Sequence, residues 1–212
     1  MVGSKDLAQQ MALHFSRAPK TRVVGFLDDF RPVGDPTPGG PVLGPVSRVT
    51  ALLRSGVFDE VAIGIGYRHL VRRGEVISSL VGNVPLATYV HPTCWVDPTA
   101  EIGEGAFLLP HCAVDANARV GTGSLLNVGC VVCHDSVVGE NCFLGPRVTL
   151  AGFVRIEAGC FLGIGTTVID SVPEFAKIPN REKQDYYNKL IGFSGLLLAG
   201  YNEGKQTNNR ET

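Results

Sequence analysis

The sequence lacks an excess of charge of either sign, since its 212 residues include 19 Lys and Arg and 20 Asp and Glu. Without a basic surplus there is no electrostatic reason to expect nucleic acid or an acidic membrane surface as a partner. A secretory apolar region near the N-terminus and an apolar run of membrane-spanning length are absent as well. These absences predict a cytoplasmic protein without a membrane partner.

What the sequence does contain is an aliphatic residue at every sixth position over its central part. The series is Val90, Val96, Ile102, Leu108, Val114, Val120, Leu126, Val132, Val138, Leu144, Leu150, Ile156, Leu162 and Val168. Neither an α-helix, with period 3.6, nor an ordinary strand, with period 2, produces this spacing. A fixed six-residue period is typical of a β-solenoid, in which short repeats bury their apolar side chains by stacking. Three hexads then form one triangular coil, about 4.8 Å from the next coil.

A second column of small or β-branched residues supports the first, because it falls four positions after each aliphatic residue. Its members are Cys94, Ala100, Ala106, Cys112, Ala118, Ser124, Cys130, Ser136, Cys142, Val148, Val154, Cys160 and Thr166. We expect both columns to point into a narrow prism. The residue directly after the aliphatic one is often glycine, as at Gly103, Gly121 and Gly139, which predicts a positive φ at that corner position.

The six cysteines are explained by the same register. Five of them belong to the small inward column, so we interpret them as packed, buried hydrophobes. Cys130 and Cys133 form a nominal C-x-x-C pair, but the repeat places one in the core and the other at a corner. The pair is therefore not expected to have a redox or zinc-binding role.

Residues 1–88 alternate between strand-like and helical patterns, which predicts a small parallel sheet of Rossmann type. Helices are expected over residues 6–17, 47–55 and 69–80, strands over 22–27, 58–64 and 86–90, and a loop over the proline- and glycine-rich stretch 32–45. Residues 89–171 form the solenoid domain. The period fails after Val168, because Glu174 stands at the next aliphatic position, so coiling is expected to end there. Residues 172–212 would form a C-terminal segment, with a helix over 181–190 and a disordered tail from 202.

His134 is the candidate catalytic residue of the solenoid. It follows an inward aliphatic residue by two places, so the repeat puts it on the outside near a corner, with Asp135 beside it. An exposed imidazole next to a carboxylate is suited to general base catalysis, since its unperturbed pKa lies near neutrality. Gly152 stands one coil later, where a missing side chain leaves room for a substrate and the backbone N–H can act as an oxyanion donor. A surface histidine without function is the alternative interpretation.

Several segments together resemble one family of enzymes. They are the α/β unit, His91-Pro92-Thr93, Ile102 to Gly105, Asn127 to Asp135, and Cys160 to Gly165. The chain resembles sugar-nucleotide N-acetyltransferases of the hexapeptide-repeat superfamily, which acetylate amino sugars such as nucleotide-linked 4-amino-4,6-dideoxy sugars. The resemblance covers about residues 20–170. It implies a left-handed β-helix, which departs from the usual right-handed crossover, and a homotrimer with active sites between subunits.

The resemblance also implies roles for individual residues, with acetyl-CoA as co-substrate and no metal. His134 would be the general base, Asp135 its orienting neighbour and Gly152 the donor to the thioester carbonyl. The residues implied to bind the nucleotide sugar are Asp28, Asp29, Gly64, Tyr67, Arg68, Lys5 and Asn127. The residues implied to contact acetyl-CoA are Gly152, Gly163, Ile164 and Gly165.

The sequence departs from this family at both ends. The family opens with a complete strand and a glycine-rich turn for the phosphates, whereas this chain begins with little strand character and a single glycine, Gly3. The phosphate contact is then expected from Lys5 or from the first amides of the following helix. The early end of the coiling near Val168 would shorten the coenzyme groove, or leave its completion to the C-terminal segment.

Three alternative functions remain open at this point. O-acetylation of a sugar hydroxyl would use the same base and the same thioester. A zinc enzyme built on a β-helix needs three histidine ligands, but His91, His111 and His134 include no closely spaced pair. A non-catalytic, nucleotide-binding scaffold would explain the reduced glycine loop and the shortened solenoid.

Overall fold

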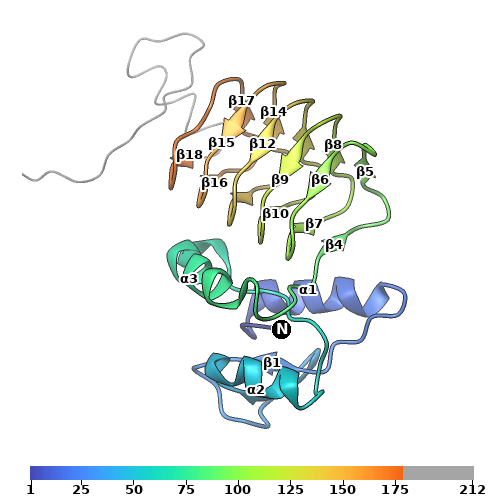
Figure 1. Ribbon diagram of the computed structural model, residues 1–212, viewed down its shortest axis with the longest axis vertical. Coiled ribbons are helices and arrows are strands. Elements are labelled where there is room, and N and C mark those ends of the chain that lie inside the picture. Colours follow the sequence, from blue (N-terminus) through green and yellow to red (C-terminus); the bar gives the residue numbers. More distant parts are fainter. Residues whose placement is uncertain (179–212) are drawn as a thin grey trace, which may run out of the picture.

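The computed structural model describes residues 1–178, which form an α/β unit followed by a parallel β-helix (Figure 1). The helices of the unit are α1 (Asp6–Arg17), α2 (Val49–Arg54) and α3 (Leu70–Leu80), with 3-10 turns η1 (Val46–Arg48) and η2 (Tyr67–His69). The helix expected over residues 6–17 is confirmed to the residue, because Ala8, Met11, Ala12 and Phe15 form its buried face. The segments expected over 181–190 and 202–212 lie outside the described residues.

Five parallel segments form the sheet of the α/β unit. β1 (Phe26–Leu27) pairs with β3 (Gly40–Gly44), Val2 bridges Leu27 and Ile63, and Val61 bridges Leu86. Across the sheet the order is therefore β3, β1, the segment of Val2, the segment of Val61 and Ile63, and the segment of Leu86. In chain order these are the third, second, first, fourth and fifth segments. The expected strands are much shorter than predicted, and residues 58–64 contribute isolated bridges only. The chain start, expected to have little strand character, supplies the central segment of the sheet.

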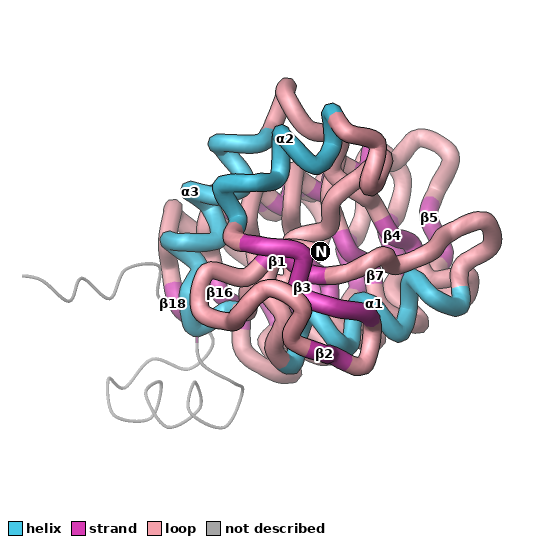
Figure 2. The backbone as a smooth tube through the Cα atoms, turned by 90° about the horizontal axis from the view of Figure 1, so that it is seen from below, coloured by secondary structure: helices cyan, strands magenta, loops and turns pink. Residues whose placement is uncertain are grey.

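The stretch 32–45, expected to be a loop, contains a hairpin, so that prediction is wrong. β2 (Pro36–Thr37) pairs antiparallel with β3, and Figure 2 shows β3 between β1 and β2. Pro36 lies opposite Pro41 in this register. Proline is tolerated at a sheet edge, where its missing N–H is not required. The proline and glycine content of this stretch therefore led to a predicted loop where an edge strand forms.

The β-helix consists of two-residue strands that stack on three faces (Figure 1). Face 1 contains β4 (Tyr89–Val90), β7 (Phe107–Leu108), β10 (Leu125–Leu126), β13 (Phe143–Leu144), β16 (Phe161–Leu162) and β18 (Lys177–Ile178). Face 2 contains β5 (Trp95–Val96), β8 (Ala113–Val114), β11 (Val131–Val132), β14 (Thr149–Leu150) and β17 (Thr167–Val168). Face 3 contains β6 (Glu101–Ile102), β9 (Arg119–Val120), β12 (Val137–Val138) and β15 (Arg155–Ile156). Parallel pairing at an interval of eighteen residues confirms the three-hexad coil that the period predicts, and it fits the left-handed β-helix that the resemblance implies.

The inward columns form the core of the prism, as predicted. The aliphatic residues from Leu108 to Val168 are almost entirely buried, and so are Cys112, Cys130, Cys142 and Cys160. Each inward thiol donates to a backbone carbonyl, as Cys130 Sγ does to Gly145 O at 3.2 Å. The first coil is less well covered, since no coil lies before it: Val90 is 39% exposed and Cys94 is half-buried.

The corner glycines serve close packing and not a positive φ, so that expectation is wrong. From Ile102 to Leu162, the left-handed backbone falls at the third residue after each aliphatic one, for example at Asn117, Asp135 and Phe153. A Cβ atom on Gly121, the residue directly after the aliphatic one, would lie 2.5 Å from the carbonyl carbon of Gly139 in the next coil. Glycine is required there because adjacent coils approach backbone to backbone.

Coiling continues past Val168, which corrects the predicted stop. Val172 bridges Ile156, and β18 pairs with β16 so that Ile178 lies opposite Leu162. The interval between paired residues falls from eighteen to sixteen here, because two residues are missing from one corner. This deletion shifts the six-residue pattern by two positions, and coiling continues beyond it.

The outward residues divide the three faces by chemical character. Those of face 1 are Tyr89, Phe107, Leu125, Phe143 and Phe161, followed by Lys177. Those of face 2 are Trp95, Ala113, Val131, Thr149 and Thr167, and those of face 3 are Glu101, Arg119, Val137 and Arg155. The apolar side chains of face 1 pack against Met11 and Phe15 of α1. The α/β unit therefore covers face 1 and leaves face 2, which carries no charge, open.

A buried arginine joins α3 to the β-helix. Arg73 is 1% exposed, and its Nη1 donates to Asn141 Oδ1 at 2.7 Å, while Asn141 Nδ2 donates to Leu70 O at 2.9 Å. Its Nε and Nη2 atoms have no partner among residues 1–178. Burial lowers the pKa of Arg73 to about 10, because desolvation disfavours the cation. Asn141 is thus the single polar contact of a buried charge within this part of the chain.

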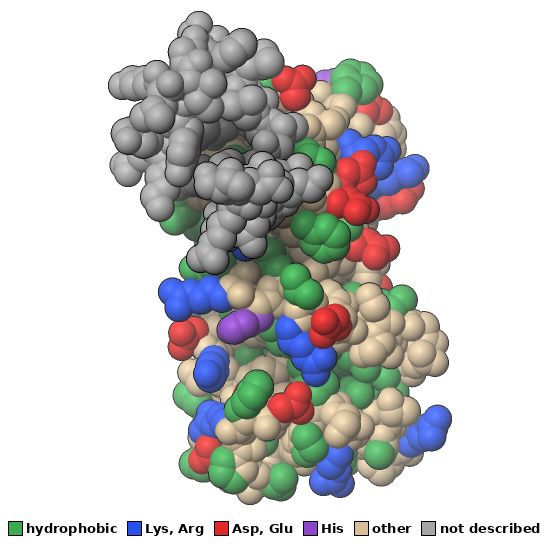
Figure 3. Space-filling model, turned by 90° about the vertical axis from the view of Figure 1, so that its left-hand side faces the viewer, with side chains coloured by type: hydrophobic (Ala, Val, Ile, Leu, Met, Phe, Trp, Pro, Cys, Tyr) green, Lys and Arg blue, Asp and Glu red, His purple; other side chains and the backbone are tan. Residues whose placement is uncertain are grey.

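Charges are mixed on the surface that carries α3. Figure 3 shows basic side chains interspersed with acidic ones on this side, without a continuous basic patch. Within residues 1–178 no helix is long and apolar enough to cross a membrane.

Candidate active site

His134 lies on the edge between faces 2 and 3, in the corner that joins β11 to β12. Its side chain is 50% exposed, as the repeat predicted, and its Nδ1 lies 3.0 Å from Asp135 Oδ2. Asp135 has φ +57°, which turns its carboxylate back along the edge, and aspartate tolerates this conformation well. The left-handed corner is therefore what brings two consecutive side chains into contact.

The contacts of Asp135 determine which nitrogen of His134 is free. Hydrogen bonds from His134 and from Asn117 Nδ2, at 3.1 Å, hold the pKa of Asp135 below its ordinary value, so the carboxylate is ionised at neutral pH. An ionised carboxylate accepts a hydrogen bond from Nδ1–H of the neutral ring. The Nε2 lone pair of His134 is then left exposed as an acceptor, which is the arrangement a general base requires.

Gly152 lies directly beside the His134 ring. A Cβ atom at this position would lie 2.7 Å from Cε1 and 2.8 Å from Nε2 of His134. The Gly152 N–H makes no hydrogen bond with any residue between 1 and 178. The glycine therefore leaves room for the ring and presents a free donor close to Nε2, as an oxyanion site requires.

Substitution of Gly152 tests this arrangement. We expect Gly152→Ala to displace the His134 ring and to lower any His134-dependent turnover by about 100-fold or more, the scale of general base catalysis. Ala116, one coil before His134 in the same column, gives a matched control, since Ala116→Gly should leave turnover unchanged. Steady-state kinetics would measure both, and an active Gly152→Ala enzyme would refute the packing argument.

Phe153 and Asn117 were not singled out from the sequence. The Phe153 ring packs edge-to-face against His134 with centroids 5.1 Å apart, although the side chain is 74% exposed. Its φ of +61° is costly for a bulky residue, and such strain is often retained at functional sites. Both residues lie one coil from Asp135, at intervals of eighteen. Following the eighteen-residue column from His134 and Asp135 would have identified them.

Four of the residues implied to bind a nucleotide sugar gather at one edge of the sheet. Lys5 follows Val2, Asp28 and Asp29 follow β1, and Gly64 follows Ile63, so all stand at the carboxyl ends of adjacent parallel segments. Gly3 has φ +83° and lies against Gly64, where an added Cβ would meet the Gly64 carbonyl oxygen at 3.2 Å. In open α/β sheets, ligands bind outside the carboxyl ends of the strands, where the strand order reverses.

The two aspartates have different environments. Asp28 is buried, and it accepts hydrogen bonds from Ser4 Oγ at 2.5 Å and from Phe30 N at 2.9 Å. Asp29 is more exposed, accepts from Val46 N at 2.8 Å and lies 3.7 Å from Arg72 Nη2. Asp28 thus connects the residues just before α1 to the end of β1, and Asp29 connects η1 to the same end. These contacts use part of the hydrogen-bonding capacity of both carboxylates.

Tyr67 links this edge to the β-helix, and Arg68 follows it in η2. The Tyr67 ring stacks on Phe161 with centroids 4.9 Å apart and lies 5.1 Å from the Phe143 ring. The carboxyl edge of the sheet therefore faces the later coils of face 1.

Asn127 and residues 163–165 do not lie beside His134. They occupy the edge between faces 1 and 2, one side of the prism away. Asn127 Oδ1 accepts from Val128 N at 2.8 Å, and the Gly163 N–H donates to Ile178 O at 2.8 Å. Ile164 remains 60% exposed. Within one chain, the residues implied to bind acetyl-CoA are therefore divided between two edges.

His91 and His111 lie at the edge between faces 1 and 2, away from His134. Among residues 1–178, no three His, Cys, Asp or Glu side chains are grouped in a way that could hold a metal ion. The described part of the chain thus offers no three-ligand site of the kind that the zinc alternative requires.

The fold defined by these observations, an α/β unit on one face of a parallel β-helix, is found in solved acetyltransferases. Perosamine N-acetyltransferase from Caulobacter crescentus, a variant with one histidine replaced by asparagine in complex with CoA and GDP-perosamine, has a TM-score of 0.71 at 23% identity, covering 84% of this chain and 91% of that one. The acetyltransferase domain of PglB from Neisseria gonorrhoeae, in complex with acetyl coenzyme A, has a TM-score of 0.68 at 22% identity, with the same coverages. WeeI from Acinetobacter baumannii has a TM-score of 0.70 at 23% identity, covering 84% of this chain and 86% of that one. No family model and no curated protein matches the chain.

Proposed function

We propose that the protein transfers the acetyl group of acetyl-CoA to the amino group of a nucleotide-linked amino sugar. The observation that carries this proposal is the His134–Asp135–Gly152 constellation. Gly152 packs against the His134 ring, and neither His134 Nε2 nor the Gly152 N–H has a hydrogen-bond partner among residues 1–178. The similar structures add support, since two of them were solved with CoA or acetyl coenzyme A and one of these with GDP-perosamine.

In this proposal His134 acts as the general base. Its Nε2 takes a proton from the sugar amine as the nitrogen attacks the thioester carbonyl carbon, and the Asp135 carboxylate stabilises the imidazolium that forms. The Gly152 N–H donates to the oxygen that becomes negatively charged in the tetrahedral intermediate. When the C–S bond breaks, the proton on His134 is returned to the departing thiolate, so the base is regenerated.

The α/β unit would bind the nucleotide as a Rossmann-like domain. The strand order of the unit supports this, since its reversal lies between Val2 and Ile63, beside Lys5 and Gly64. The first amides of α1 would receive a phosphate at the positive end of the helix. Phe30 is 90% exposed next to Asp28, which leaves its ring free to stack on the base. We expect Phe30→Ala to raise KM for the nucleotide sugar about 10-fold without lowering kcat, and steady-state kinetics would measure both.

We further propose a homotrimer with each active site between two subunits. Face 2 is uncharged and open, and it lies between the edge with His134 and the edge with Ile164. If three copies place face 2 around a threefold axis, the first edge of one copy meets the second edge of its neighbour. The α/β unit on face 1 adjoins the Ile164 edge, so its nucleotide would reach the partner's His134. This arrangement would bring the two groups of residues implied to bind acetyl-CoA, Gly152 and residues 163–165, to the same subunit interface.

Complementation between subunits tests the shared site. His134→Ala lacks the base and Asp28→Asn disturbs the nucleotide edge, so each variant alone should have low activity. Mixed in equal amounts by joint refolding, they should regain about one quarter of wild-type activity, because each mixed trimer contains one intact site. Sites within single chains would regain none. Size-exclusion chromatography with light scattering would measure the oligomeric state separately.

Direct assay tests the reaction itself. Purified protein is incubated with acetyl-CoA and UDP-, dTDP- or GDP-linked 4-amino-4,6-dideoxy sugars, and release of free thiol is measured. We expect release with one of these sugars and none with its hydroxyl analogue. Thiol release with the hydroxyl analogue would indicate O-acetylation, and binding of nucleotide sugar without binding of acetyl-CoA would indicate a scaffold.

A further inference from the structure

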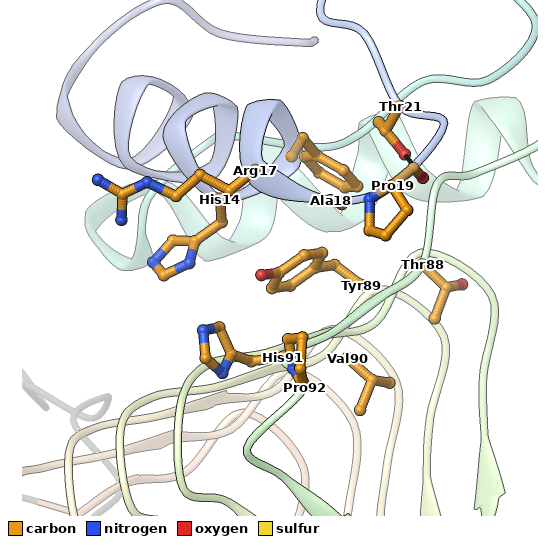
Figure 4. Close-up of a pocket in the computed structure, with 11 residues that line it drawn as sticks. His14, Arg17, Ala18, Pro19, Thr21, Thr88, Tyr89, Val90, His91 and Pro92 are labelled. Atoms are coloured by element: carbon orange, nitrogen blue, oxygen red, sulfur yellow. Dashed lines mark hydrogen bonds between the residues drawn. The ribbon is translucent and has the colours of Figure 1, made fainter.

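A cavity lies away from the two sites described so far, which are the nucleotide edge of the sheet and the edge of the β-helix with His134. It has a volume of about 370 Å³ and opens between the end of α1 and the first coil of the β-helix (Figure 4). His14, in the last turn of α1, is eight residues from Asp6, so about 12 Å of helix separates the cavity from the nucleotide edge. His134 lies on a different edge of the prism.

The cavity has two chemically distinct ends, as Figure 4 shows. His14, Arg17 and His91 gather at one end, with the Tyr89 hydroxyl pointing toward them. The other end is lined by Ala18, Pro19 and Val90, together with the two hydroxyl-bearing residues Thr21 and Thr88. A cavity of this size with few polar groups at one end is typical of a site for a small organic ligand.

The polar end consists of hydrogen-bond donors. The rings of His14 and His91 meet edge-to-face with centroids 5.8 Å apart. Thr93 N–H donates to His91 Nδ1 at 3.2 Å, so the proton of the neutral ring is on Nε2, away from Thr93. The side chains of His14, Arg17 and Tyr89 make no hydrogen bond with any residue between 1 and 178. Tyr89 is only 6% exposed, so its hydroxyl is oriented toward the cavity without a protein partner.

Among residues 1–178, no carboxylate lines the cavity to offset the positive charge of Arg17 at this end. No Asp or Glu lines the cavity, and the titratable groups facing it are His14 and Arg17 on α1, and Tyr89 and His91 on the strand, with Cys94 close to Tyr89. The pKa of His14 lies below its ordinary value, because burial and the neighbouring His91 and Arg17 disfavour its cation. A bound anion would reverse this effect by supplying the missing opposite charge.

We propose that this cavity binds the phosphate monoester of a small organic molecule. The phosphate would lie between His14, His91 and Arg17 and accept a hydrogen bond from Tyr89, since guanidinium and imidazolium donors favour phosphate oxygens. The organic part would lie against Ala18, Pro19 and Pro92. The site is not needed for acetyl transfer, so its failure and that of the proposed function are distinguishable.

Calorimetry on the full chain tests the proposal, with inorganic phosphate, phenyl phosphate and sulfate as probes. Phenyl phosphate should bind about 10-fold more tightly than inorganic phosphate, because its ring covers the apolar end. Sulfate keeps its double charge over the range used, so the pH dependence of its affinity reports on the protein. Because the pKa of His14 lies below its ordinary value and a bound anion would stabilise the His14 cation, sulfate affinity should rise about 10-fold from pH ~8 to pH ~6.

Variants locate the binding. We expect His14→Gln and His91→Gln each to weaken phenyl phosphate binding about 10-fold, and His14→Gln to flatten the pH dependence of sulfate binding. Arg54→Gln, which removes a positive charge from the exposed end of α2, should change neither. His14 is half-buried and lies outside the buried face of α1, so its variant is expected to fold, which its melting temperature would check. Unchanged binding in both histidine variants, or no binding of phenyl phosphate by the wild type, would overturn the proposal.

Discussion

Replacement of His134 by alanine is expected to lower kcat for acetyl transfer by about 10²- to 10⁴-fold, the usual contribution of a general base. KM for both substrates should change little, because the proposed mechanism gives the ring a contact with the reacting atoms and none with the nucleotide or the coenzyme. The half-exposed ring contributes little to the core, so the melting temperature should stay within a few degrees of the wild-type value.

Two further variants separate catalysis from positioning. Asp135→Asn retains the shape but loses the charge that orients His134, and we expect a smaller loss of about 10- to 100-fold. Arg119→Ala, on the exposed face 3, is the control and should be as active as the wild type. Stopped-assay kinetics at saturating substrate would measure all three. Near-normal turnover of His134→Ala would remove this residue from the role of base.

The second large effect concerns stability. Asn141→Leu should lower the free energy of unfolding by about 3 to 5 kcal/mol, because the buried Arg73 guanidinium would lose its only hydrogen-bond acceptor among the described residues. Arg73→Met, of similar length and without charge, is expected to be neutral or stabilising. Both variants delete the same hydrogen bond. The test is therefore whether Asn141→Leu lowers the free energy of unfolding more than Arg73→Met does.

Thermal or urea unfolding, followed by circular dichroism, would measure these changes at one fixed protein concentration. Arg155→Met, an exposed arginine whose ion pair with Glu157 spans 3.7 Å, gives the control for loss of a positive charge. Equal destabilisation by Asn141→Leu and Arg73→Met would show that the hydrogen bond, and not the unpaired charge, determines the result.

The sequence predicted the β-helix well because its signal is repeated in every coil. Leu126 and Val132 are defined by period alone, so an error at one position is corrected by its neighbours. The α/β unit offers no such redundancy. Its segments at Val61 and Ile63 pair through isolated bridges, and their pairing is determined by packing between distant parts of the chain.

The candidate site was predicted where it depends on the repeat. The exposure of His134 and its proximity to Gly152 follow from an interval of eighteen residues, and both are found in the structure. The contact of Tyr67 with Phe161 and the buried contact of Arg73 depend on how the unit docks on face 1. Docking of this kind leaves no periodic signal, so sequence reasoning could not find it.

The shortened corner before Val172 has a consequence for folding. Coils of eighteen residues with similar inward side chains are nearly interchangeable, so a chain that paired one coil too far along would still bury aliphatic residues. The sixteen-residue interval between β16 and β18 is compatible with one alignment only, since a displaced coil would leave two residues without a place. Asn141 accepts a hydrogen bond from Arg73 in one coil only. This contact and the sixteen-residue interval together distinguish the native register from otherwise similar ones. Restoring two residues at this corner is therefore expected to slow folding to the active register more than it alters the stability of the finished prism.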